Sequence, residues 1–150
     1  MIAWSFGSIK IGVYLGPYDE NKIELTVKSK SIGSTEALGF TVQEASSSDN
    51  IEFWPELTME SENRRQAIYA SSKKALENAE RQNISSVGFY TLGFEVARVP
   101  SWEVAEEIAK AIFTHSKWSN KVKEVVVVSS SPTQVSSFQY AFENIDIITP

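Results

Sequence analysis

The strongest constraint on the fold is a run of four valines, Val125 to Val128, inside the segment Lys123–Ser129. A strand that is apolar at every position is typical of the middle of a parallel sheet, where both faces are covered. A second nearly continuous apolar run spans Ile84–Thr91. The two runs therefore predict two buried strands of a parallel sheet.

Helical patterns surround both runs. Between them, apolar residues repeat at helical spacing after Ser101, which is placed to cap that helix: Trp102, Ala105, Ile108, Ala109, Ile112 and Phe113. Thr58–Gln82 has the same period, and a last helix is predicted from Pro132 with Ser131 as its cap. Because strand crossovers are right-handed, this alternation predicts an α/β fold with a mixed, mostly parallel sheet.

The other strands are predicted from shorter alternating segments: Ser8–Gly16, Lys22–Lys28, Leu38–Glu44, Ile51–Trp54 and, at the sheet edge, Ile145–Ile148. We expect the first two to lie side by side, as in a hairpin. The small residues of Ser29–Thr35 predict a loop, which either only connects strands or presents N–H groups to an anion.

Composition narrows the function. The 150 residues fit one domain, and the net charge of −5 gives no field that would attract nucleic acid. The chain has no cysteine, no basic signal-peptide start and no apolar run long enough to span a membrane. We therefore expect a cytoplasmic or nuclear protein.

In such a sheet, ligands bind beyond the carboxyl ends of the strands. Two loops are expected there, Thr91–Pro100 and the one containing Ser129, Ser130 and Ser131. The serine hydroxyls and the helix N-terminus after them suit an anionic group, although capping explains them as well. Arg98 is the cation best placed for a phosphate, or else a solvated loop residue.

Other polar and aromatic residues have plain structural explanations. Glu103, Glu106 and Glu107 could collect a cation, but we expect a solvated acidic face. His115 is the only histidine, and we expect it at a helix end on the surface. Phe94 and Trp54 could stack on a base, but core packing is the better prediction for each. No catalytic or metal-binding residue and no cofactor is assigned.

The segment from Arg64 to Asn144 resembles the second half of a macro domain. The resemblance is carried by an apolar strand, a loop ending at Pro100, a helix rich in Ala and Glu, the sequence KEVVVVSS and a final helix with two Phe. It implies a three-layer α/β/α sandwich that commonly binds ADP-ribose and in some members hydrolyses it from proteins or nucleic acids.

The sequence departs from that family at the ligand loops. Macro domains usually have a Ser-Thr-Gly type turn after this strand, and counting back from Pro100 places it at Gly93, Phe94 and Glu95. A glutamate there adds a side chain and a negative charge where a glycine lets the main chain approach a diphosphate. In the first half, the lone Gly33 is the counterpart of the family's Gly-rich run. Asp19 is either the counterpart of its adenine-contacting acid or a turn residue.

Two hypotheses follow. The first is a non-catalytic interaction domain with a protein partner, acting as a module of a larger protein or assembly with the ADP-ribose site lost or altered. The second is a module that binds ADP-ribose or a related nucleotide, or hydrolyses it, through Arg98 and the helix N-termini at Ser101 and Ser131. The lost glycine favours the first.

Overall fold

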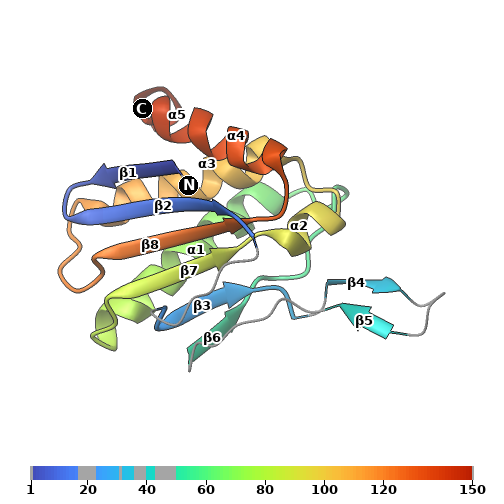
Figure 1. Cartoon of the computed structure of the whole chain (residues 1–150), viewed down its shortest axis with the longest axis horizontal. Helices are drawn as coiled ribbons and strands as arrows, with labels where there is room; N and C mark the ends of the chain where they lie inside the picture. Colours follow the sequence, from blue (N-terminus) through green and yellow to red (C-terminus); the bar gives the residue numbers. More distant parts are fainter. Residues whose placement is uncertain (1, 17–22, 31, 36–39, 43–49, 150) are drawn as a thin grey trace.

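A computed structural model describes residues 2–16, 23–30, 32–35, 40–42 and 50–149. Its main sheet has six strands in the order β1 (Ile2–Phe6), β2 (Ile9–Leu15), β8 (Glu124–Ser129), β7 (Ser86–Tyr90), β3 (Leu25–Lys28) and β6 (Asn50–Phe53). β1 is antiparallel to β2, and every other pair in this sheet is parallel. Strands β4 (Ile32–Thr35) and β5 (Phe40–Val42) form a separate antiparallel pair beside the main sheet (Figure 1).

The two apolar runs form the centre of the sheet, as predicted. β8 lies between β2 and β7, and Val125 through Val128 are all buried. β7 lies between β8 and β3, and all five of its residues are buried. Because both strands have neighbours on both sides and residues buried on both faces, apolar residues at every position suit their location.

Helices flank the sheet. They are α1 (Arg64–Arg81), α2 (Leu92–Val96), α3 (Ser101–Ser116), α4 (Pro132–Glu143) and α5 (Ile145–Ile148). Figure 1 shows α1 and α3 behind the sheet, with α4 beside α3. Their apolar residues share one core cluster with alternate residues of the strands, such as Val125 and Val127 of β8. The predicted α/β class, with a mostly parallel sheet flanked by helices, is confirmed.

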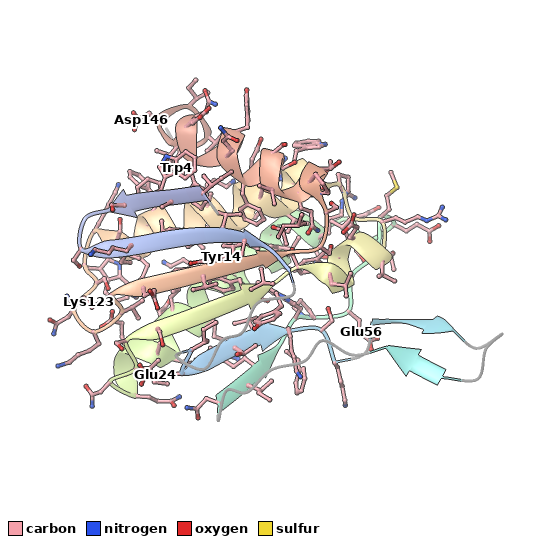
Figure 2. The ribbon with its side chains drawn as sticks, viewed as in Figure 1. Trp4, Tyr14, Glu24, Glu56, Lys123 and Asp146 are labelled. Carbon is pink, nitrogen blue, oxygen red and sulfur yellow. The ribbon has the colours of Figure 1, made fainter. Side chains whose placement is uncertain are left out.

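A second, smaller cluster lies on the opposite face of the sheet. It contains Val126 and Val128 of β8 with Ile23 and Tyr90, and Tyr14 packs against it. Figure 2 shows Tyr14 on the face turned toward the viewer. The described residues form no helix on this face. Of the helical layers that the predicted three-layer sandwich would have, the structure describes the one on the other face.

Several local predictions about strands were wrong. β2 does not pair with β3, because β8 and β7 lie between them, and its antiparallel neighbour is β1, joined through Gly7 at φ 57°. Ile145–Ile148 is the short helix α5, in which Ile145 is buried and accepts the N–H of Thr149. Ser29–Thr35 ends in a strand, β4, which pairs with β5.

The acidic side of α3 is not a solvated face. Glu103 is 5% exposed, and its carboxylate is bound by two nitrogens of Arg64 at 2.6 and 3.0 Å. Arg65 also reaches from α1 across to α3, where it binds both Glu106 and Glu107. The sequence prediction was wrong because α1 and α3 pack side by side, so charges that would face solvent on a lone helix meet opposite charges.

His115 is also buried, and not on the surface as predicted. Its ring is 0% exposed, and its Nε2 lies 3.0 Å from Oε1 of Glu80 on α1. The ring packs against Trp118 with 4.5 Å between centroids. The last turn of α3 is covered by α1 and by the chain after α3, which is why a helix-end position is not a surface position here.

Candidate functional site

The carboxyl ends of five parallel strands, β2, β8, β7, β3 and β6, meet at one edge of the sheet. In Figure 2, Glu56 lies at this edge, whereas Glu24 and Lys123 lie at the opposite one. The loops after these strands therefore come together where open α/β sheets bind ligands. They include Ser29–Lys30, the stretch 54–58, Thr91–Pro100 and Ser129–Ser131.

A buried glutamine ties two of these loops together. Gln134, in the first turn of α4, is 1% exposed. Its Oε1 accepts the hydroxyl of Thr91 at 2.7 Å and the N–H of Ser130 at 3.0 Å, and its Nε2 donates to the carbonyl of Thr91 at 3.2 Å. The start of the loop after β7 is thus fixed to the start of the helix after β8.

Glu95 of α2 extends this network toward α4. The hydroxyl of Ser130 is hydrogen-bonded to the carboxylate of Glu95. Ser131 caps α4, since its Oγ accepts the N–H of Gln134 at 3.2 Å. A carboxylate therefore lies beside the N-terminus of α4, where the sequence predicts an anionic ligand. We call the set Thr91, Glu95, Ser130 and Gln134 the edge network.

Ser129 differs from the two serines after it. It is 1% exposed, and its Oγ has no hydrogen-bond partner among the described residues. Its carbonyl accepts the N–H of Gly16 at 2.8 Å, which extends the pairing of β8 with β2. The capping alternative is confirmed for Ser131, while contact of Ser129 or Ser130 with an anion stays a prediction.

The loop after β7 contains a short helix at the positions of the family's turn. α2 includes Gly93, Phe94 and Glu95. Phe94 is 2% exposed, and its ring centroid is 5.0 Å from that of Trp54, whose Nε1 donates to the carbonyl of Tyr90 at 2.8 Å. Core packing is therefore confirmed for both aromatic residues.

Gly93 lies against the loop after β3. A β-carbon placed on Gly93 would be 1.7 Å from the Oγ of Ser29. The loops after β7 and β3 are therefore in direct contact, and only glycine fits at this position of α2. This close packing explains why position 93 is a glycine, which the sequence alone did not show.

Of the remaining predicted residues, Arg98 is joined to this network through its main chain, because its N–H donates to the carbonyl of Glu95 at 3.0 Å. The side chain of Arg98 is exposed and makes no hydrogen bond or ion pair with any residue that the structure describes, and its φ is 64°. Gly33 lies in β4, in the separate two-stranded sheet, where the main chain alone is described. Asp19 lies outside the described residues. Ligand contact by these three residues stays a prediction.

A cavity of about 440 Å³ opens at the same edge, between α2 and the chain after β6. Its walls are largely apolar, formed by Trp54, Leu57 and Phe94, with Val96 and Ala97 from α2. Two charged residues, Lys30 and Glu56, also line it. The volume lies within the range of small-molecule sites.

Sequence reasoning missed Thr91 and Gln134 at the edge. The spacing Ser131-x-x-Gln134 is that of a capping box, in which the third residue reaches back to the start of its own helix. Here Gln134 accepts the N–H of Ser130, one residue before the cap, and also reaches Thr91. The local signal was present, but the contact with Thr91 depends on how β7 and β8 pair.

Among the described ranges, no group of three or more His, Asp or Glu residues could hold a metal ion. Helices in the same ranges are all too short or too polar to cross a membrane.

The fold is similar to that of solved macrodomain structures from Oceanobacillus iheyensis. The structure with ADP has a TM-score of 0.75 at 15% identity, covering 97% of this chain and 96% of that one. The structure with MES bound gives 0.74 at 15% identity, covering 97% of both chains. A glycine-to-valine variant with ADPR gives 0.73 at 13% identity, covering 97% and 98%.

No protein-family model matches the sequence, and no curated protein matches it. At this level of identity the structural matches define the fold class: the chain has a macrodomain-like fold, as the resemblance of residues 64 to 144 predicted.

Proposed function

We propose that this chain is a non-catalytic, macro-like interaction domain in which the ADP-ribose site is altered. The observation that carries the proposal is the bond between Ser130 and Glu95. At the N-terminus of α4, where a helix attracts an anionic group, the protein's own carboxylate is present. A diphosphate brought to the same place would meet a like charge in a partly desolvated environment.

The hydrogen bonding of the edge also supports this proposal. The side-chain amide of Gln134 is used on both of its polar atoms, by Thr91 and by Ser130. A ligand that needed these groups would have to replace hydrogen bonds that are already formed. Leaving a buried donor or acceptor without a partner costs about 1–3 kcal/mol. The side chains of the edge network therefore hold the loops together.

Calorimetric titration with ADP-ribose tests the proposal. We expect no saturable heat from the wild-type protein up to about 1 mM ligand, a level at which binding free energy is only about −4 kcal/mol. Micromolar binding by the wild type would contradict it. Glu95→Gly, which removes the carboxylate, is the informative variant, and Glu77→Gln on the outer side of α1 is its control for a change of net charge.

A second candidate, binding of ADP-ribose or a related nucleotide, is favoured by the cavity between α2 and the chain after β6. Its support from other proteins is that similar structures carry ADPR and ADP. In this reading Lys30 and Arg98 would supply the positive charges for the phosphates. Lys30→Ala and Arg98→Ala should then each abolish the heat of ADP-ribose binding, whereas the first candidate predicts no heat to abolish.

The same proposal includes a protein partner in the cytoplasm or nucleus, with this chain as one module of an assembly. Fractionation of cells that express the tagged chain tests the location, since recovery in the membrane or secreted fraction would contradict it.

A further inference from the structure

β6 is the last strand of the main sheet, and its outer edge is free in the described residues. It pairs with β3 alone, in parallel. The N–H of Trp54 donates to the carbonyl of Lys28 at 2.9 Å, so the main-chain groups of Trp54 and, two residues before it, Glu52 face β3. The N–H and C=O groups of Ile51 and Phe53 consequently point outward, away from the sheet. An edge of this kind is a template for another strand.

The side chains on this edge have an apolar face. Ile51 and Phe53 are 41% and 50% exposed. They are level with Thr26 and Lys28 of β3, on the face of the sheet opposite to α1. Figure 1 shows β6 at the end of the sheet, with no helix in front of it. Two large apolar side chains, two residues apart, thus flank an open row of main-chain donors and acceptors.

The other face of the edge is a groove with a carboxylate in it. Glu52 is level with Val27 of the core, on the side of α1, and its Oε2 accepts the amide of Asn78 at 2.9 Å. A cavity of about 530 Å³ lies here, lined by Val27 and Glu52 together with Ser71, Lys74 and Asn78 of α1. Lys74 is one helical turn from Asn78, and no ion pair joins it to Glu52 in the described part of the chain.

We propose that β6 binds an extended peptide segment of a protein partner, which adds to the sheet as a further strand. The segment alternates apolar and basic residues. Its apolar side chains pack beside Ile51 and Phe53, and a basic side chain between them lies in the groove opposite Glu52. Main-chain bonds to Ile51 and Phe53 give affinity, and the alternating side chains give specificity.

Charge argues against a second copy of this chain as the occupant. If β6 paired with its own copy in antiparallel register so that Ile51 lay opposite Phe53, Glu52 would lie directly opposite Glu52. Like charges in facing positions destabilise a strand pair. A partner with a basic residue at that position converts the same contact into an attractive one. The proposal rests on the interaction role proposed above and supplies its site and the chemistry of its partner.

Two synthetic peptides test this proposal with the whole chain: Ser-Val-Lys-Val-Lys-Val-Ser, and the same peptide with glutamate in place of lysine. We expect the lysine peptide to bind at least about fivefold more tightly. Amide exchange should slow at Ile51 and Phe53, because their N–H groups become bonded. Glu52→Lys should reverse the preference between the two peptides.

Ile51→Pro removes an outward-facing donor without removing a bond to β3, since proline is tolerated on edge strands. This substitution should weaken binding of the lysine peptide at least about tenfold, while the protection of the amides of β3 and β7 from exchange is kept. Phe53→Thr should also weaken binding. Leu15→Thr is the matched control, because Leu15 is 52% exposed on another strand, and it should leave binding unchanged.

Three results would overturn the proposal: no saturable binding of either peptide at millimolar concentration, binding that Ile51→Pro leaves intact, or a dimer of the free chain that Ile51→Pro abolishes. The last would assign the edge to a second copy. These outcomes are separate from the ADP-ribose titration, because Glu95 and β6 lie on different elements. Nucleotide binding with peptide binding intact would refute the altered site alone.

Discussion

Gly93 of α2 packs so closely on Ser29 that a β-carbon on Gly93 would lie 1.7 Å from the Oγ and 2.5 Å from the Cβ of Ser29. The near atoms belong to the short side chain of Ser29 and not to the far end of a long one. Because a serine Cβ moves only with its backbone, any residue larger than glycine must push the loop after β3 away from the loop after β7.

Gly93→Ala should therefore destabilise the protein by about 1–3 kcal/mol, the usual cost of overpacking, even though alanine is the better helix former. Urea denaturation measures the loss. The control is the same change in a Ser29→Gly background, where the obstructing atoms are gone and the loss should largely disappear. An equal loss in both backgrounds would show that the contact with Ser29 is not its cause.

The backbone at Arg98 is strained for a residue with a side chain. Its φ is 64°, in the left-handed region, and the side chain is exposed. Arg98→Gly should raise the free energy of unfolding by about 1 kcal/mol, since glycine adopts this conformation without the steric penalty. Thermal and urea denaturation would show the gain, and Arg98→Ala, which keeps the β-carbon, should not. A gain from alanine as large as that from glycine would contradict the backbone explanation.

The ion pair between Arg64 and Glu103 joins α1 to α3, with Arg64 partly exposed and Glu103 buried. Arg64→Met leaves the carboxylate of Glu103, which is 5% exposed, without its partner and should lower the free energy of unfolding. The double variant Arg64→Met, Glu103→Leu should recover much of that loss, because no unpaired charge stays buried. A double-mutant cycle by urea denaturation measures the coupling, and strictly additive losses would refute it.

The sequence was sufficient for elements whose signal is local. β7 and β8 follow from continuous apolar runs, and α4 follows from helical spacing with Ser131 and Pro132 at its start. Helical spacing also predicts α1 and α3, although α1 begins at Arg64 and not at Thr58, and Pro100 and not Ser101 is the cap of α3. The expectation of a macrodomain-like fold came from the resemblance of residues 64 to 144 to a macro domain. Each of these conclusions depends on residues close together in the chain, where side-chain period and capping act.

The predictions that were wrong depended on pairing between segments that are distant in the sequence. β2 and β3 are near in sequence but separated by β8 and β7, and no local pattern states that order. Glu103 and Arg64 are each typical surface residues until α1 and α3 pack together. The edge network has the same character, because the contact of Thr91 with Gln134 requires β7 beside β8. β6 was predicted as a strand, but its free edge could be recognised only from the order of the strands in the sheet.

Glu80 holds the chain after α3 in place. Its carboxylate accepts the main-chain N–H groups of Lys121 at 2.8 Å and Val122 at 3.1 Å, and the hydroxyl of Ser119 at 2.8 Å. Burial raises the pKa of this carboxyl, but the hydrogen bonds from Val122, Lys121 and Ser119, with one from His115, outweigh it and lower the pKa from 4.5 to about 2. The ionised form is thus the one that the fold stabilises.

Glu80→Gln should destabilise the protein by about 2 kcal/mol at neutral pH, because several donors lose a charged acceptor. The pKa is lower in the folded state than in the unfolded state, so this stabilisation is complete above about pH 4.5 and is lost as the pH falls toward 2. In urea denaturation series, the difference between wild type and variant should be present at pH 5 and shrink through that interval. Glu77→Gln, exposed on the same helix, should change stability by less than about 0.5 kcal/mol. A difference that persists unchanged at pH 2 would mean that Glu80 acts through packing and not through its charge.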